Sequence, residues 1–302
     1  MIFVTGANGF VGKHLCHELS SRKIEYKAGV RKFSRVNQVE YGDFTLCKDW
    51  GPILIRVDVV IHLVARVHVM NENSTDPLAA FMATNCDATI NLARAAKEAG
   101  VKRFIFLSSV KVNGEGTFDK AFTARDEPSP QDPYGISKME AEKALMKLHE
   151  SGVFEIVIIR PPLIYGKGVK ANFLNLLNLV KKGIPLPFGM ADSNKRSLVS
   201  VHNLIDILIL CTHHKGAAGQ VFMVSDDCDL STKELVLKMG KASNSSLFLL
   251  PVPLFIMKFV AFILGKKAYS ERLLGNLQVD ISETKSRLNW RPTYTFEETS
   301  LL

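Results

Sequence analysis

The sequence predicts an α/β fold, a doubly wound parallel sheet with a smaller C-terminal lobe. In the first half of the chain, short runs of β-branched and aromatic residues alternate with longer stretches whose apolar residues recur at helical spacing. A glycine-rich segment lies directly between the first such run and the first helical stretch. This alternation requires parallel strands joined by crossover helices, and the turn after the first strand is where such folds hold a phosphate.

The elements follow in chain order. The predicted strands are residues 1–4, 25–30, 57–63, 103–107 and 155–159. The helices between them are residues 11–21, 77–99 and 133–150, and Gly100 and Gly152 are C-caps of the last two. Further helices are expected at 172–182, 201–212, 232–241 and 282–288, with a strand at 221–224 that rejoins the sheet. We expect residues 1–165 to form the sheet domain and residues 166–302 to form mainly the lobe, with the ligand between them.

Composition narrows the classes of function. Apolar residues make up 47% and charged residues 23% of the 302 residues, which is typical of a globular protein. The net charge of +8 suits an anionic substrate, and nucleic-acid binding is not expected because no dense Lys/Arg run with interleaved aromatics occurs. The five widely spaced cysteines and the absence of a signal-peptide pattern favour a reducing, cytoplasmic location, with neither a disulfide framework nor a metal site.

One strongly apolar segment stands apart, residues 248–264, FLLPVPLFIMKFVAFIL. Pro251 and Pro253 break its start and Lys258 lies inside it, so its helical part is too short to span a bilayer. We expect a buried or interface helix, and peripheral membrane contact is the less favoured alternative.

The glycine-rich segment is TGANGFVG at residues 5–12. Glycines allow a tight turn and a close approach of main-chain N–H groups to a phosphate, which the helix N-terminus also attracts. The spacing of Gly6, Gly9 and Gly12 is G-x-x-G-x-x-G and not G-x-G-x-x-G. A plain glycine-rich turn is the alternative, but the position between strand and helix favours dinucleotide binding.

The end of the second predicted strand bears on which dinucleotide binds. Arg31 stands there and Arg35 follows. A carboxylate at this place selects NAD, whereas an arginine can pair with the 2′-phosphate of NADP(H). NADP(H) is therefore favoured, NAD(H) is possible, and a solvated basic loop is the bland alternative. Asp43 is positioned for the adenine amine, while Leu63 and Ala65 offer small side chains beside the cofactor.

The candidate catalytic groups are Tyr134 and Lys138, four residues apart on one helix face. An adjacent ammonium lowers the pKa of a tyrosine from its usual value of about 10, and such a tyrosine can remove a proton from a sugar hydroxyl as hydride leaves the same carbon. Ser108 and Ser109 end a predicted strand, where a hydroxyl can bond the substrate oxygen or simply cap a turn. The order of glycine loop, serine pair and Y-x-x-x-K favours catalysis.

With these motifs, the sequence resembles extended short-chain dehydrogenases/reductases, and among them the UDP-glucose 4-epimerase-like (NAD-dependent epimerase/dehydratase) family. It is also similar to bacterial enzymes that reduce a UDP-linked 4-keto-6-deoxy amino sugar. The segments that carry the resemblance are TGANGFVG at 5–12, VIHLVA at 60–65, Asn85 in ATNCDAT, RFIFLSSVKVNG at 103–114, YGISK at 134–138, RPPLIYGKG at 160–168, RSLVSVHNL at 196–204 and RLNWRP at 287–292.

The resemblance implies roles for individual residues. The implied catalytic residues are Ser109, Tyr134 and Lys138. The implied cofactor-binding residues are Gly6, Gly9, Phe10, Val11, Gly12, Asp43, Leu63, Ala65, Asn85, Tyr134, Lys138 and Pro161, and Arg31 is added to them from its place at the strand end. The implied contacts to a UDP-sugar substrate are Ser109, Lys111, Tyr134, Asn172, Pro187, Arg196 and Arg272.

Three positions depart from the pattern of that family. Arg31 stands where NAD-using epimerases have an acidic residue, Asn113 replaces the tyrosine of V-Y-G, and Pro161-Pro162-Leu163 replaces an aromatic-Asn-Pro stretch beside the sugar. Reduction of a UDP-4-keto-6-deoxy sugar for surface polysaccharide and 4-epimerisation of UDP-glucose or UDP-N-acetylglucosamine both stay open, and Arg31 favours reduction. A non-catalytic NADP(H) sensor is a third alternative, which the complete set of catalytic residues disfavours.

A homodimer is the expected assembly, because relatives pair the helices that correspond to 77–99 and 133–150. The apolar residues of these two helices are more than one sheet-facing stripe would hold. They are Phe81, Ile90, Ala93, Ala144, Leu145 and Leu148. The alternative is that the chain's own packing covers this surplus.

Overall fold

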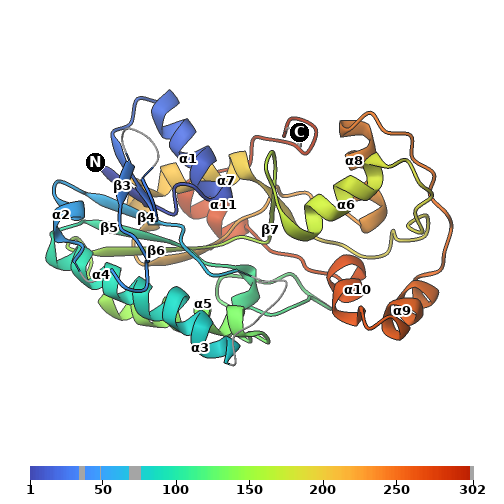
Figure 1. Ribbon diagram of the computed structural model, residues 1–302, viewed down its shortest axis with the longest axis horizontal. Coiled ribbons are helices and arrows are strands. Elements are labelled where there is room, and N and C mark those ends of the chain that lie inside the picture. The colour runs from blue at the N-terminus through green and yellow to red at the C-terminus, as the bar shows by residue number, and fades with distance from the viewer. Residues whose placement is uncertain (34–37, 48, 68–75, 300–302) are drawn as a thin grey trace.

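A seven-stranded, wholly parallel sheet forms the centre of the computed structural model, which describes residues 1–33, 38–47, 49–67 and 76–299 (Figure 1). Arg35 lies outside these ranges. The strand order is β3-β2-β1-β4-β5-β6-β9. The strands are β1 Ile2–Thr5, β2 Tyr26–Val30, β3 Gln38–Glu40, β4 Val59–His62, β5 Arg103–Leu107, β6 Glu155–Arg160 and β9 Gln220–Met223. The order reverses between β1 and β4, and ligands of such sheets bind beyond the carboxyl ends of the strands at this reversal.

The predicted fold class is confirmed. Every strand predicted from an apolar run is present within two residues of its expected bounds, because strands covered on both faces are apolar almost throughout. Three strands of three residues each were not predicted, β3, β7 (Leu163–Tyr165) and β8 (Leu198–Ser200). The last two form a separate parallel pair beside the sheet.

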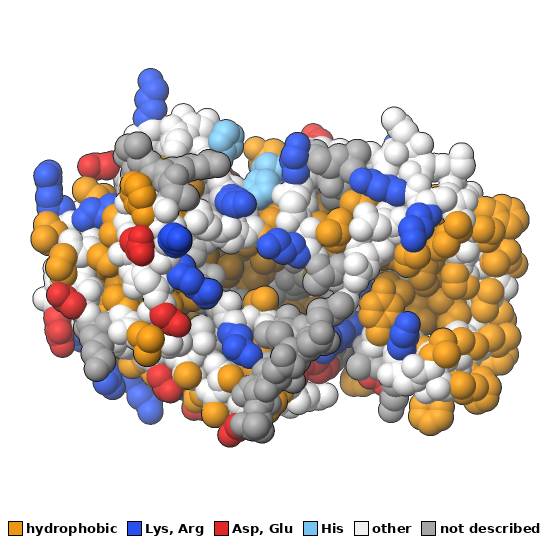
Figure 2. All heavy atoms as spheres, in the orientation of Figure 1, with side chains coloured by type: hydrophobic (Ala, Val, Ile, Leu, Met, Phe, Trp, Pro, Cys, Tyr) orange, Lys and Arg blue, Asp and Glu red, His pale blue; other side chains and the backbone are white. Residues whose placement is uncertain are grey.

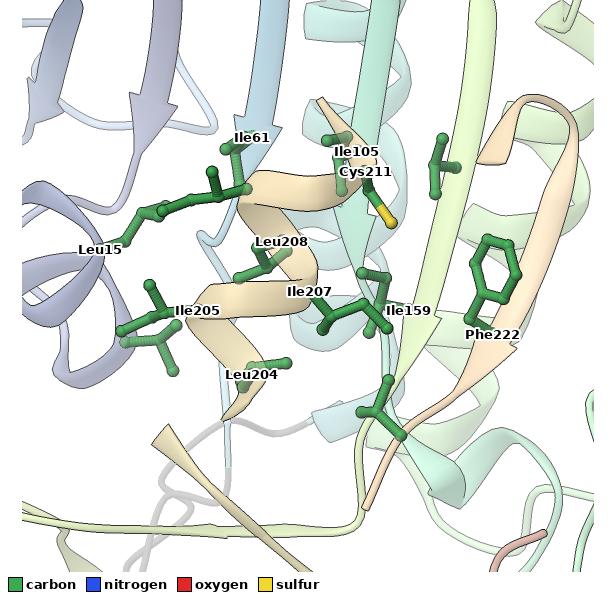
Figure 3. Close-up of a cluster of buried hydrophobic side chains, with 14 of the residues drawn as sticks. Leu15, Ile61, Ile105, Ile159, Leu204, Ile205, Ile207, Leu208, Cys211 and Phe222 are labelled. Carbon is green, nitrogen blue, oxygen red and sulfur yellow. The ribbon is translucent and has the colours of Figure 1, made fainter. Parts of the chain in front are cut away.

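Helices cover both faces of the sheet (Figure 1). One face carries α1 (Phe10–Ser21), α7 (Val201–Cys211) and α11 (Ser282–Leu288), and the other carries α2 (Gly51–Leu54), α4 (Ala88–Glu98) and α5 (Pro133–Leu148). Helix α7 is apolar nearly all round, as expected for a helix that is buried against the sheet on one side and against α1 on another. Figure 3 shows its packing against Leu15, Ile61, Ile105 and Ile159.

The helix predicted over residues 77–99 is interrupted. It consists of α3 (Pro77–Met82), a π-helical segment (Ala83–Asp87) and α4. Asn85 lies inside the π-helical segment, fully buried, and its amide bonds sideways to Arg66 and Ser137. One extra residue in the turn allows that inward orientation, and such π-bulges are frequent at functional sites.

The C-terminal lobe contains α6 (Ala171–Lys181), α8 (Thr232–Ala242), α9 (Leu254–Ile263) and α10 (Lys267–Leu274). Its apolar core lies mainly between α6 and α8. Of the two expectations for residues 248–264, a buried helix is wrong because no residue of α9 is buried, and an interface helix stays a prediction. The core is already filled, so α9 contributes only the partly buried Leu254 and Met257 to it.

The helices expected to form a dimer interface use part of their apolar surplus within the chain. Phe81, Ala93 and Leu145 are buried, while Ile90, Ala144 and Leu148 are half-buried. The homodimer therefore stays a prediction. Less apolar surface remains on these helices for a second copy than the sequence indicated. Among the described residues no helix has the length and apolar character needed to cross a membrane, and no group of metal-ligating side chains is assembled.

Candidate active site

The glycine-rich turn packs tightly between β1 and α1. Gly6 adopts a φ of +67°, and its carbonyl accepts a hydrogen bond from Gly9 N–H at 2.9 Å. A Cβ on Gly12 would lie 2.3 Å from the Gly6 oxygen, so α1 can approach the turn only with glycine there. Phe10 and Val11 begin α1, whose N-cap, Gly9, has no side chain. The turn thus presents backbone rather than side chains at a helix N-terminus and fits the pyrophosphate of a dinucleotide.

Arg31, Asp43 and Tyr41 gather at the end of β2. Hydrogen bonds from the Thr45 hydroxyl and N–H, at 2.7 and 2.9 Å, lower the pKa of Asp43, and the charge of Arg31 lowers it further. Burial raises the pKa of Tyr41, opposed by a hydrogen bond from Gly6 N–H and by the Arg31 charge. The exposed Arg31 therefore lies beside the glycine turn, where the ribose of a bound dinucleotide would be. Tyr41 was not predicted, since its only signal was proximity to Asp43.

The end of β4 completes this side of the site. The Leu63 main chain lies against Gly6, where an added Cβ would be 3.2 Å from the Leu63 carbonyl carbon. Ala65 follows, half-buried. The Asn85 amide accepts from Arg66 N–H at 2.8 Å and donates to the Arg66 carbonyl at 3.0 Å and to the Ser137 hydroxyl at 2.9 Å. Asn85 therefore ties the loop after β4 to helix α5, rather than offering a free amide to the cofactor.

Helix α5 brings Tyr134 to Ser109. Asp132 caps α5 by accepting from Gly135 N–H at 2.7 Å. A Cβ on Gly135 would lie 2.8 Å from the Lys111 carbonyl, so only glycine allows α5 to start against the 3₁₀ turn Val110–Val112. Ser109 caps that turn through Lys111 N–H at 3.2 Å, and its hydroxyl lies near enough to the Tyr134 hydroxyl to lower the pKa of Tyr134. The capping role of Ser109 is confirmed, and its role as a catalytic hydroxyl stays a prediction that this position allows.

Burial dominates the titration of Tyr134. It raises the pKa of Tyr134 to about 12, while the Ser109 hydrogen bond lowers it and the Asp132 charge raises it. The expected lowering by the Lys138 ammonium is not among these causes, which corrects the prediction from sequence. The reason is that burial also lowers the pKa of Lys138 itself to about 7, so this side chain is only partly charged near neutral pH. Its Nζ donates to the Leu107 carbonyl at 2.8 Å and lies 4.3 Å above the Phe106 ring.

A buried network of polar side chains lies next to Ser109 and Lys138. Glu142 and Arg160 form a bidentate ion pair with N···O distances of 2.5 to 3.1 Å, and Ser108 donates to Glu142. Arg160 also donates to Asn113 at 3.1 Å, and Asn113 donates to the Thr123 carbonyl at 2.9 Å. Asn113, where the family has tyrosine, thus turns into the protein.

This network was not predicted from sequence. Glu142 stands one helical turn after Lys138 and two after Tyr134, and that i, i+4, i+8 spacing was the available signal. Pro161, the next residue after Arg160, is buried, and its carbonyl accepts from Val110 N–H at 3.0 Å. Pro161 therefore anchors the turn that carries Ser109 through its carbonyl. Its side chain is buried, and its contact with the cofactor stays a prediction.

Charged side chains connect the catalytic helix with the lobe. Lys111 forms ion pairs with Asp132 and with Glu115, the latter at 2.7 Å. Burial lowers the pKa of Arg196 to about 10, with Glu115 raising it and Arg272 lowering it. Arg196 and Arg272 thus lie close enough to repel each other, near one carboxylate. Two neighbouring guanidinium groups of this kind suit a diphosphate.

The two other predicted substrate-binding residues, Asn172 and Pro187, also belong to the lobe. Asn172 lies in the first turn of α6, and Pro187 lies in a segment whose neighbours pair with Phe248 and Leu250. Both are half-buried in the lobe. No hydrogen bond joins Asn172 to Arg196 in the described part of the chain. On the face drawn in Figure 2, the surface is hollowed between the sheet-containing half and the lobe.

Comparison with known proteins gives consistent matches. The model of the NAD dependent epimerase/dehydratase family matches residues 2–225. A UDP-glucose 4-epimerase of Vibrio cholerae is 46% identical over 98% of this chain and 92% of its own length. The structure of MoeE5 in complex with UDP-glucuronic acid and NAD has a TM-score of 0.77 at 21% identity, over 99% of this chain and 95% of that one. RMD from Pseudomonas aeruginosa, complexed with NADPH, has a TM-score of 0.76 at 22% identity, over 99% and 95%.

Lys138 leads to a prediction about pH and stability. Its pKa is about 7 in the folded chain and near 10.5 when unfolded, so between these values the unfolded chain binds more protons. The penalty of burying Lys138 is therefore complete below pH 7 and is relieved as the pH rises toward 10.5. In urea unfolding from pH 6 to 10, wild type should gain stability relative to Lys138→Met. An unchanged difference across that range would contradict the lowered pKa.

Proposed function

The chain belongs to the NAD dependent epimerase/dehydratase family, and from that premise we propose that it is a UDP-hexose or UDP-N-acetylhexosamine 4-epimerase. The observation that carries this proposal is that Ser109 lies beside Tyr134, with Lys138 one helical turn further along α5. The nearby Lys111 pairs with Glu115, whose charge in turn acts on Arg196 in the lobe. Ser109 and Tyr134 suit proton transfer at one sugar carbon, while Arg196 in the lobe would hold the diphosphate of the same substrate. A sensor would have no use for this arrangement.

The chain's own residues would move the proton and hold the substrate. When bound, a nicotinamide dinucleotide supplies a site that accepts a hydride and can return it. The Tyr134 oxygen would take the proton of the C4 hydroxyl and give it back, and the Ser109 hydroxyl would hydrogen-bond the same oxygen. Because burial opposes the phenolate, positive charge near Tyr134 is required in the loaded site. Lys138 would hydrogen-bond the ribose.

Epimerisation is preferred here to reduction. The preference for reduction rested on Arg31, and the comparisons do not confirm it. Arg31 lies beside Asp43 at the end of β2, away from Ser109 at the end of β5, so it bears on which dinucleotide binds and not on the fate of the sugar. The relative with 46% identity is itself a 4-epimerase, which favours this alternative. Cytoplasmic location remains part of the proposal.

The reaction is tested with UDP-glucose and UDP-N-acetylglucosamine at catalytic amounts of cofactor. The expected result, followed by proton NMR of the anomeric region, is that one of them converts to its C4 epimer and that equilibrium is reached from either side. Tyr134→Phe should reduce the rate by about 10²- to 10⁴-fold with the fold retained, because it removes the proton-transfer group. Turnover close to wild type in this variant would refute the mechanism. Failure to epimerise either sugar, together with reduction of a UDP-4-keto-6-deoxy sugar in proportion to the reduced cofactor consumed, would instead identify a reductase.

The cofactor preference is tested at Arg31. If Arg31 pairs with a 2′-phosphate, wild type should bind NADP(H) more tightly than NAD(H), and Arg31→Asp should reverse that order by removing a charge-assisted bond worth about 1.5–3 kcal/mol. Calorimetric titration of both proteins with both cofactors measures this. Lys32→Asp, an exposed neighbour, is the matched control for general charge effects. Wild type that prefers NAD(H) would show that Arg31 is only a surface residue.

The placement of the substrate is tested at Arg196. Arg196→Ala should weaken competitive inhibition by UDP about tenfold or more, because one charge-assisted contact to a diphosphate is lost. Lys195→Ala, next to it and exposed, should leave inhibition unchanged. Equal inhibition constants for wild type and Arg196→Ala would move the diphosphate away from this residue.

A further inference from the structure

The outer end of the lobe carries an extended apolar surface. It comprises Phe248, Leu250, Phe255, Ile256, Phe259, Val260, Phe262, Ile263 and Leu264, all of them exposed. Phe255 and Phe259 are 71% and 62% exposed, and none of the α9 residues is buried. Figure 2 shows a broad apolar area at the end of the lobe where Figure 1 places α9. We call it the α9 face. Apolar surfaces of this size on a folded chain mark an interaction site.

The α9 face has the geometry of a helix lying flat on a surface. Phe255, Phe259 and Phe262 follow each other at i, i+4 and i+7, which aligns them along one side of α9. Leu254 and Met257 point to the lobe's core. Phe248 and Leu250 extend the face from a neighbouring segment, which residues 186–189 hold by backbone hydrogen bonds. The ten residues of α9 span only about 15 Å, half the thickness of a bilayer's hydrocarbon core.

The charged residues of the chain segment that forms the α9 face have one sign, and the first carboxylate after it is Glu271 in α10. Residues 235–270 contain five lysines and no aspartate or glutamate. Lys258 lies within α9, exposed among the phenylalanines, and Lys266 follows the helix, also exposed. A second copy of the chain related by a two-fold axis would bring the lysines of both copies together. An anionic lipid surface instead offers an apolar layer for the phenyl groups and phosphates for the lysines.

We propose that the α9 face docks the protein reversibly on the surface of a bilayer that contains anionic phospholipids. The aromatic side chains enter the boundary between headgroups and acyl chains, while Lys258 and Lys266 bind lipid phosphates. Helix α9 packs beside α10, the helix that carries Arg272. Docking would therefore bring α10, and with it Arg272, near the membrane surface. This proposal does not depend on which diphosphate sugar is the substrate.

The test is sedimentation of the full-length protein with vesicles of phosphatidylcholine alone or with one-third phosphatidylglycerol. Wild type should bind the anionic vesicles, bind neutral vesicles at least tenfold more weakly, and be released as salt is raised. The double variant Phe255→Ser/Phe259→Ser should lose at least tenfold in binding to anionic vesicles. Lys258→Glu should weaken the same binding. Because these side chains are exposed, all variants should keep wild-type turnover of a soluble nucleotide sugar.

Phe118→Ser is the matched control, since Phe118 is 92% exposed but lies outside the α9 face. It should bind vesicles as wild type does. Wild type that stays in the supernatant with both kinds of vesicle would overturn the proposal, as would a double variant that binds like wild type. A dimer seen by light scattering and abolished by the double variant, without vesicle binding, would assign the α9 face to a second copy instead.

Discussion

The buried ion pair between Glu142 and Arg160 is the constraint on which the site depends. Both side chains are almost completely buried, and removing one partner of such a pair costs about 3–5 kcal/mol because the other charge remains unpaired. The pair joins α5 to the end of β6, and the bond from Ser108 adds the end of β5. Three elements that are distant in sequence are thereby fixed beside the predicted catalytic residues, Ser109 after β5 and Tyr134 and Lys138 on α5. Burial lowers the pKa of Lys138, and the charge of Glu142 partly offsets this by raising it.

The geometry of the catalytic groups follows from that arrangement. Ser109 stands next to the bonded Ser108, and Tyr134 and Lys138 stand on the same helix face as Glu142. Close backbone contacts at two glycines hold helix starts against neighbouring turns. Gly12 lets α1 approach the glycine-rich turn, and Gly135 lets α5 approach the turn that follows Ser109. Asn85 holds the loop after β4 in place by hydrogen bonds to Arg66 in that loop and to Ser137 in α5. The rigid sheet side of the site thus meets a lobe that contributes mainly charge, through Arg196 and Arg272.

The sequence allowed the sheet to be predicted, because strand periodicity and glycine placement are local signals, and it also indicated Ser109, Tyr134 and Lys138, whose catalytic roles stay predictions. It did not allow the π-helical segment at Asn85 to be predicted, since that distortion is imposed by partners far along the chain. The pKa of Tyr134 was misjudged for a related reason: burial depends on tertiary packing, whereas the i, i+4 spacing shows only that Lys138 is near. The exposure of α9 was equally invisible, since an apolar helix looks the same in sequence whether it is covered or bare.

The most direct test of the account uses UDP-glucose that carries deuterium at C4. If Ser109 and Tyr134 act at C4 and the hydride returns to the carbon it left, the epimer should carry the deuterium at C4, with none released to water. Mass spectrometry of the purified epimer and of the cofactor pool measures both quantities. Deuterium that accumulates in free cofactor beside a 4-keto sugar, or an epimer that has lost the label to solvent, would contradict the account.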